Sequence, residues 1–158
     1  MLAAGDQAPP FDLPDLDGGR HQLDDTPTLA VFWKPGCGTC HLAFPYLQRL
    51  LEAYPGGRWR LLAISQDRGQ PSRDFARTYG LGFPILIEGE GWPVSRRYDP
   101  EATPTLFLIG PDGTIEMTSV GFDKEELNTI SRRVAERLGE TPKVIAEEND
   151  GNPPFKPG

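Results

Sequence analysis

The only two cysteines of the chain are Cys37 and Cys40, which are separated by two residues. Such a Cys-x-x-Cys pair can exchange disulfides, because one thiolate attacks a disulfide and the second thiol resolves the mixed disulfide. A helix is expected to begin here, and its free N–H groups and dipole lower the pKa of the first thiol. Cys37 is therefore the expected nucleophile and Cys40 the expected resolving thiol. Two ordinary buried cysteines are the alternative, but the flanking Gly36 and Gly38 leave room for the backbone of a partner.

Hydrophobic patterning predicts a strand and a helix on either side of this pair. Residues 28–33 (TLAVFW) form a nearly unbroken apolar run, which is typical of a strand buried on both faces of a sheet. Apolar residues recur at helical spacing from Thr39 to Tyr54, where a Pro-Gly-Gly sequence follows. Residues 58–65 predict a second strand. The three segments together predict a strand–helix–strand unit with a right-handed crossover.

The remaining patterned segments complete an α/β fold. They are expected, in chain order, as strands at 11–13 and 20–23, a helix at 71–79, a strand at 83–87, a helix near 94–98, and strands at 104–109 and 114–120. The first two form an N-terminal β-hairpin. The last two must be antiparallel because their link is a short turn, so the central sheet is mixed. The middle segments form an inserted βα unit.

The end of the chain divides into a helix and a tail. Asp123 begins a capping box, and the apolar stripe that follows predicts a last helix. We therefore expect one domain over residues 1–139, since a chain of 158 residues can bury a single sufficient core. Residues 140–158 are acidic and then Pro-rich, with little apolar content. They are expected to form a flexible tail, with Phe155 as its candidate docking residue.

The order of these motifs resembles the thioredoxin superfamily, and within it the TlpA/ResA-like branch that neighbours the AhpC/TSA peroxiredoxins. The resemblance covers about residues 5–139. It rests on GDQAPPFDL at 5–13, FWKPGCGTC at 32–40, Pro45, ATPT at 102–105 and Gly121. It implies a thioredoxin-like three-layer fold. It also implies a thiol:disulfide oxidoreductase that exchanges disulfides with protein substrates, acting as a reductant rather than an oxidant.

The resemblance also implies a substrate-binding surface. Thr103 and Pro104 would be joined by a cis peptide bond that faces the cysteines, and the Thr103 backbone would pair with a bound substrate segment. An ordinary trans proline that opens a strand is the alternative. Gly36 would belong to the same surface. It stands where such proteins commonly carry a tryptophan, which leaves partner recognition open.

Two acidic residues of related proteins are missing. Val31 occupies the position of the buried aspartate of thioredoxin, and Ala43 occupies that of a glutamate in ResA-like proteins. Each acid would accept the proton of the resolving thiol. The expected consequence is either slow resolution or a water molecule or another group that takes the place of the acid.

Lys34 and His41 are candidates for tuning the thiol pKa values. The charge of Lys34 could favour the Cys37 thiolate, and His41 directly follows Cys40. The alternative for each is a structural or surface role, because a lysine near a helix start is usually solvated and a lone histidine is usually a surface or core residue.

Other readings of the motif remain open. Cys37–His41 is a literal Cys-x-x-Cys-His haem-attachment sequence, although it follows a buried strand rather than lying in a small helical domain. A zinc site would need more ligands than the cysteines and two distant histidines supply. Pro35 and Thr39 match part of a peroxiredoxin pattern, but Leu42 occupies the peroxidatic cysteine position. A redox-inactive binding module is a further alternative. We expect no cofactor and no metal.

Charge and hydropathy narrow the expected partners. The net charge of −7, with scattered lysine and arginine, gives no basis for nucleic-acid binding. No apolar run reaches the roughly 18 residues of a membrane span. No basic and apolar leader opens the sequence, which leaves a cytoplasmic protein or one whose signal was removed. The resemblance favours an extracytoplasmic or periplasmic monomer. Its implied partners are protein thiols and disulfides, apocytochrome c, or a membrane electron donor.

Overall fold

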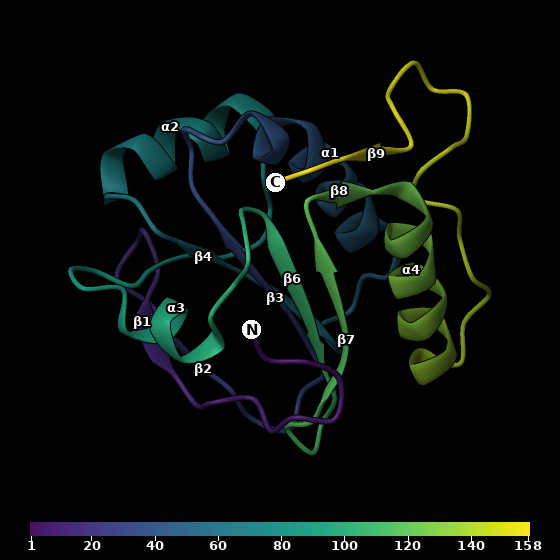
Figure 1. The fold of residues 1–158 in the computed structure, drawn as a ribbon. Coiled ribbons are helices and arrows are strands. Elements are labelled where there is room, and N and C mark those ends of the chain that lie inside the picture. Colours follow the sequence, from purple (N-terminus) through teal and green to yellow (C-terminus); the bar gives the residue numbers. More distant parts are fainter.

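The computed structural model describes residues 1–158 (Figure 1). Its strands are short and are distributed along the whole chain. They are β1 (Asp12–Pro14), β2 (Arg20–Gln22), β3 (Thr28–Trp33), β4 (Arg60–Ser65), β5 (Ile85–Ile87), β6 (Thr105–Ile109), β7 (Ile115–Val120), β8 (Phe122–Asp123) and β9 (Phe155–Lys156).

Four helices connect or cover these strands. They are α1 (Gly38–Ala53), α2 (Gly69–Tyr79), α3 (Pro93–Tyr98) and α4 (Lys124–Leu138). Helix α2 begins two residues before the expected start at Pro71, because proline is tolerated in a first turn where no intrahelical N–H bond is lost. Helix α4 begins after the N-cap Asp123, whose side chain accepts a hydrogen bond from the Glu126 N–H at 3.0 Å.

The central sheet has five strands in the order β5-β4-β3-β6-β7. Strand β3 is parallel to β4 and antiparallel to β6, so the sheet is mixed as expected. All six residues of β3 are buried, which explains its unbroken apolar sequence. The inserted segments add β5 at the edge beside β4, and β1 and β2 form the separate N-terminal hairpin.

Alternate residues of β3 enter two different cores. Leu29, Val31 and Trp33 belong to the larger core, where α1 and α4 pack on one face of the sheet. Ala30 and Phe32 belong to the smaller core on the opposite face, with α3 and the N-terminal segment. The three layers therefore meet at β3, the strand that leads into the cysteine pair. The predicted thioredoxin-like α/β fold is confirmed.

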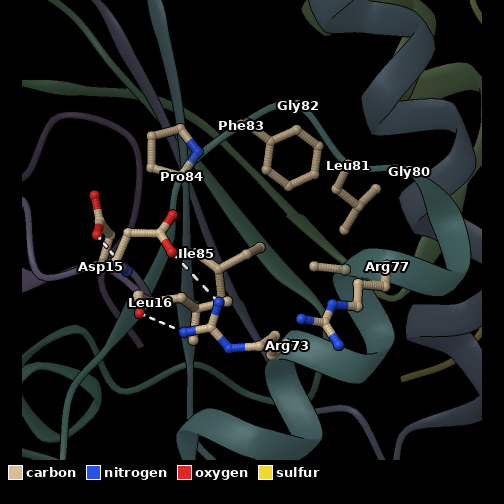
Figure 2. Close-up of a pocket in the computed structure, with 12 residues that line it drawn as sticks. Asp15, Leu16, Arg73, Arg77, Gly80, Leu81, Gly82, Phe83, Pro84 and Ile85 are labelled. Atoms are coloured by element: carbon tan, nitrogen blue, oxygen red, sulfur yellow. Dashed lines mark hydrogen bonds and ion pairs between the residues drawn. The ribbon is translucent and has the colours of Figure 1, made fainter.

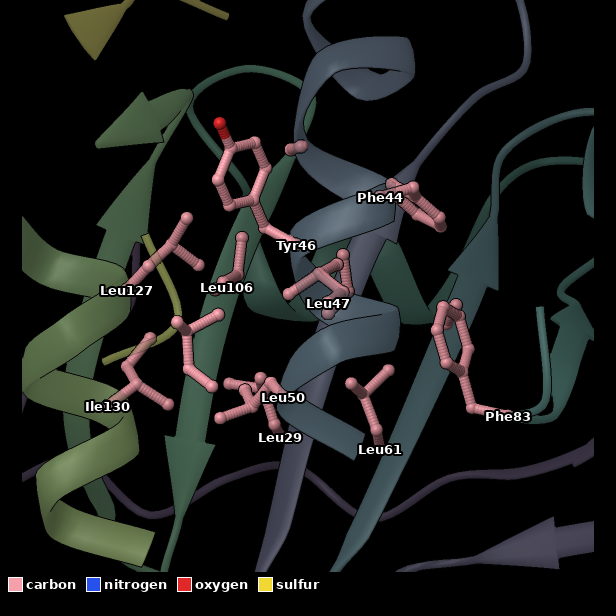
Figure 3. Close-up of a cluster of buried hydrophobic side chains, with 14 of the residues drawn as sticks. Leu29, Phe44, Tyr46, Leu47, Leu50, Leu61, Phe83, Leu106, Leu127 and Ile130 are labelled. Carbon is pink, nitrogen blue, oxygen red and sulfur yellow. The ribbon is translucent and has the colours of Figure 1, made fainter. Parts of the chain in front are cut away.

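The larger core holds α1 firmly on the sheet. Figure 3 shows Leu47 and Leu50 of α1 in one cluster with Leu29 of β3 and with Ile130 of α4. Full burial of one such side chain contributes about 1.5–3 kcal/mol. The helix that carries the cysteines is thus fixed by packing along its length.

The residues after α4 lie against the domain, although their composition predicts a flexible tail. Ile145 and Ala146 are buried in the larger core, and the Asn128 side chain accepts hydrogen bonds from both of their N–H groups at 2.9 Å. Further along, β9 pairs antiparallel with β8. Most of these contacts are polar bonds to the backbone of the tail, which hydropathy patterns do not register. In Figure 1 the yellow chain end returns to α1.

Candidate active site

Cys37 is the N-cap residue of α1. Strand β3 ends at Trp33, and a short loop brings Cys37 into an extended conformation with φ −92° and ψ 116°. Its Sγ accepts a hydrogen bond from the Cys40 N–H at 3.2 Å. The sulfur thus takes the place that a serine or aspartate oxygen usually fills at a helix start.

The two thiols have opposite pKa shifts. Burial, the largest influence, raises the pKa of Cys37. Hydrogen bonds with the Cys40 side chain, Thr103, and the Cys40 and Thr39 backbone outweigh it, so the pKa lies below its usual value. Burial raises the pKa of Cys40 far above its usual value, and the hydrogen bond with Cys37 adds to the rise. Cys37 is 9% exposed, whereas Cys40 is not exposed at all. Of the two thiols, only Cys37 therefore combines a small exposed fraction with a lowered pKa.

The segment before β6 faces the cysteines. The Thr103–Pro104 peptide bond is cis, and the Thr103 carbonyl accepts a hydrogen bond from the Cys37 thiol at 3.1 Å. The Pro104 carbonyl accepts a hydrogen bond from the Gly121 N–H at 2.8 Å, which ties this turn to the end of β7. The structure thus brings Cys37, Cys40, Thr103 and Pro104 together.

The other sequence candidates lie around this centre. Gly36 is exposed, and a Cβ added there would meet no atom within 4 Å. Lys34 is also exposed, and its backbone carbonyl accepts a hydrogen bond from the Cys37 N–H at 3.2 Å. Both ring nitrogens of His41 are engaged elsewhere, at 2.5 Å from the Tyr79 hydroxyl and 2.9 Å from the Pro35 carbonyl oxygen. His41 thereby links α1 to α2 and to the preceding loop.

The positions of the missing acids are apolar and buried. Val31 and Ala43 belong to the same core as Cys40, with exposed fractions of 0% and 2%. No carboxylate is among the groups that dominate the pKa of Cys40. The resolving thiol therefore lies in an apolar environment.

A model of the AhpC/TSA family matches residues 4–118. The chain belongs to the AhpC/TSA family. It is 33% identical over 131 residues to the thiol-disulfide oxidoreductase ResA of Geobacillus kaustophilus, which covers 80% of this chain and 75% of that protein. It is 32% identical over 134 residues to the thioredoxin-like protein YneN of Bacillus subtilis, with 80% and 77% covered.

A similar solved structure also comes from a protein of thiol:disulfide exchange. A Chlorobium tepidum protein assigned as the thiol:disulfide interchange protein DsbE is 25% identical to this chain, with a TM-score of 0.78. The match covers 88% of this chain and 100% of that one. Together with the Cys-x-x-Cys pair, the relatives show that this AhpC/TSA-family member is a thioredoxin-like thiol:disulfide oxidoreductase. Its family implies protein thiols and disulfides as substrates.

The sequence did not predict that the last residues of the chain lie next to the cysteines. The Thr39 hydroxyl, between the two cysteines, donates a hydrogen bond to the Pro157 carbonyl at 2.8 Å. A Cβ added to Gly158 would lie 2.7 Å from the Thr103 carbonyl oxygen. No motif or periodicity in the tail signals these contacts, because they involve its backbone.

A groove elsewhere on the chain has neither cysteine in its lining. This groove has a volume of about 520 Å³ and lies between α2, the segment before β5 and the hairpin region. Figure 2 shows the residues that line it. Arg73 crosses it to reach the Leu16 carbonyl at 2.5 Å and Asp17 at 3.3 Å, which connects α2 to the hairpin turn. No group of three or more His, Cys, Asp or Glu residues is placed to hold a metal ion. None of the helices combines the length and hydrophobicity that crossing a membrane requires.

Proposed function

We propose that Cys37 is the nucleophile and Cys40 the resolving thiol of a reductase for protein disulfides. The observation that carries this assignment is the asymmetry of the pair. The Cys37 sulfur caps α1, keeps a small exposed fraction and has a lowered pKa, while Cys40 is fully buried and has a raised pKa. A low-pKa thiolate attacks first, and a protected thiol stays reduced until the mixed disulfide is next to it.

The reaction transfers two electrons to the substrate. The Cys37 thiolate attacks one sulfur of a substrate disulfide, which forms a mixed disulfide and releases the other sulfur as a thiolate. Cys40 then attacks Cys37 Sγ and forms the Cys37–Cys40 disulfide. The second substrate sulfur leaves with the electrons, and the proton of Cys40 passes to a leaving thiolate. That thiolate serves in place of the acids absent at Val31 and Ala43. A thiol electron donor then reduces the pair.

The backbone of Thr103 and cis-Pro104, with the open surface at Gly36, would bind the substrate segment. Support comes from the 3.1 Å approach of the Thr103 carbonyl to the Cys37 thiol. Lys34 would act on thiol ionisation through its charge, and its backbone hydrogen bond also lowers the pKa of Cys40 against the larger effect of burial. His41 would act through the position of the Pro35 carbonyl.

Reduction of insulin with dithiothreitol as the electron donor tests this function. The wild-type chain should accelerate precipitation of the insulin B chain, whereas Cys37→Ser should not. Cys40→Ser should instead accumulate a mixed disulfide with insulin, because the resolving step is missing. Because the chain holds no other cysteine, each trapped adduct reports on one thiol. A Cys40→Ser variant that forms no adduct, while Cys37→Ser does, would reverse the two roles.

The resemblance to TlpA/ResA-like proteins supports a proposal for the cellular setting. We propose an extracytoplasmic, monomeric reductant that receives electrons from a membrane donor, with apocytochrome c among its candidate substrates. A reduction potential near that of thioredoxin supports a reductant, and a strongly oxidising potential argues for an oxidase. Fractionation of the native host and gel filtration test location and oligomeric state.

A further inference from the structure

The tail segment, residues 154–158, lies across the cysteine pair. Its first part forms β9, which pairs antiparallel with β8. Beyond β9, the Pro157 carbonyl accepts the hydrogen bond from the Thr39 hydroxyl at 2.8 Å. Gly158 then touches the cis-proline turn, because a Cβ added to it would lie 2.7 Å from the Thr103 carbonyl oxygen. The tail segment thus contacts both sides of the site.

These contacts use the backbone group that a substrate would need. The Thr103 carbonyl lies 3.1 Å from Cys37 Sγ, and a disulfide approaching that sulfur brings its own backbone to the same turn. Two chains cannot occupy this place together. We propose that the tail segment fills the substrate groove, by which we mean the surface beside Cys37, Thr103 and Pro104, and that a substrate must displace it to reach Cys37. This inference rests on the proposed function of the site.

The fit at Gly121 is independent evidence that the tail segment and the domain are shaped for each other. Gly121 has φ +76°, and a Cβ there would lie 2.6 Å from the Lys156 carbonyl oxygen and 2.9 Å from the Gly158 nitrogen. The same glycine binds the Pro104 carbonyl through its N–H at 2.8 Å. A residue without a side chain therefore allows the tail and the cis-proline turn to meet.

The attachments of the tail allow it to leave without unfolding the domain. Ile145 is buried in the core, but every residue from 147 to 158 is exposed. One side chain, Lys124, holds much of this stretch. Its Nζ donates to the Glu147 carbonyl at 2.8 Å and the Asn152 carbonyl at 3.0 Å, and it pairs with Asp150 at 2.6 Å. Lys124 is itself only 6% exposed because the tail covers it, so release of the tail returns its ammonium group and the tail carbonyls to water, where new hydrogen bonds replace the old ones.

The geometry also indicates the kind of substrate that competes. The tail segment is extended and pairs with β8 through its main chain, a mode of recognition that accepts many sequences. The partner is therefore an extended or unfolded polypeptide that carries a disulfide. A small disulfide needs less of the groove and should depend less on tail release.

The test uses Lys124→Met and Asp150→Asn in the full chain, with Glu116→Gln as the matched control. Lys124→Met keeps the apolar stem and removes the tail bonds, and Asp150→Asn removes one charge. Glu116 pairs with Arg137, also on α4, and does not contact the tail. The measured quantities are the rate of Cys37 alkylation by a polyethylene glycol maleimide and kcat/KM for insulin. Thermal unfolding confirms that each variant is folded.

Lys124→Met should raise the maleimide rate and the insulin kcat/KM about tenfold, because the loss of these hydrogen bonds shifts an open–closed equilibrium by that order, and Asp150→Asn should raise both in the same direction. Reduction of a small aromatic disulfide should change much less, and Glu116→Gln should change none of these rates. Equal alkylation rates in the wild type and in both tail variants would overturn the proposal. Faster alkylation without insulin reduction in any of the proteins would support the closed tail and refute the proposed function instead.

Discussion

Replacing Cys37 in two ways separates its structural role from its chemical role. In both Cys37→Ser and Cys37→Ala the nucleophile is lost, so neither protein should reduce insulin. The two variants should nevertheless differ in stability. A serine oxygen can accept the Cys40 N–H, now 3.2 Å from the sulfur, and donate to the Thr103 carbonyl, now at 3.1 Å. Alanine can do neither.

The expected difference follows from these two bonds. Loss of an N-cap oxygen costs about 1 kcal/mol, and loss of a second partly buried hydrogen bond adds about 0.5 kcal/mol. With a urea slope of about 2 kcal/mol per molar, the midpoint of Cys37→Ala should lie about 0.7 M below that of Cys37→Ser. Equilibrium unfolding under reducing conditions measures it. Equal midpoints would show that residue 37 does not cap α1.

Three further predictions concern the same elements. The rate of Cys37 alkylation by iodoacetamide should reach half its maximum below pH 9.0, because the pKa of Cys37 is lowered from that value. Cys40, whose pKa is raised, should stay unmodified until the protein unfolds. Simultaneous labelling of both thiols in the folded protein would contradict this. Phe44→Ala should lower the free energy of unfolding by about 3–5 kcal/mol, because this fully buried ring packs against the strand before the site, and a loss below 1 kcal/mol in urea unfolding would contradict that packing. The hydrogen bond with His21 lowers the pKa of Asp15 below 3.8. The Asp15 carboxylate therefore stabilises the fold above pH 3.8, and this stabilisation is lost as the pH falls through the lower pKa of the folded state. Asp15→Asn should lose less stability than the wild type on acidification, and identical losses would exclude the contribution.

The elements that build the domain were predictable because their apolar residues are periodic. The run at 28–33 has no polar interruption, and the structure buries it on both faces. The stripe on α4 ends at Gly139, whose left-handed conformation, with φ 69°, ends the helix. Local spacing likewise placed Cys37 at a helix start.

The position of the tail was not predictable in the same way. Only Ile145 and Ala146 in residues 140–158 enter the core, and two adjacent apolar residues define no period. The rest is held by side chains such as Lys124, which lies at the start of the preceding helix and binds carbonyls 23 and 28 residues further along the chain. A lysine within a helix normally indicates a solvated surface. Its burial here arises only once the tail lies over it.

The burial of Ile145 has a consequence for competition at the site. Residues 147–157 form a short tether between this anchor and the hydroxyl of Thr39, so a released tail segment remains within a few nanometres of the groove. A tether of this length gives an effective concentration on the order of millimolar. A substrate at micromolar concentration therefore competes with a tethered ligand about a thousandfold more concentrated. Only substrates that bind the site tightly enough can therefore displace the tail, and weakly binding polypeptides are excluded.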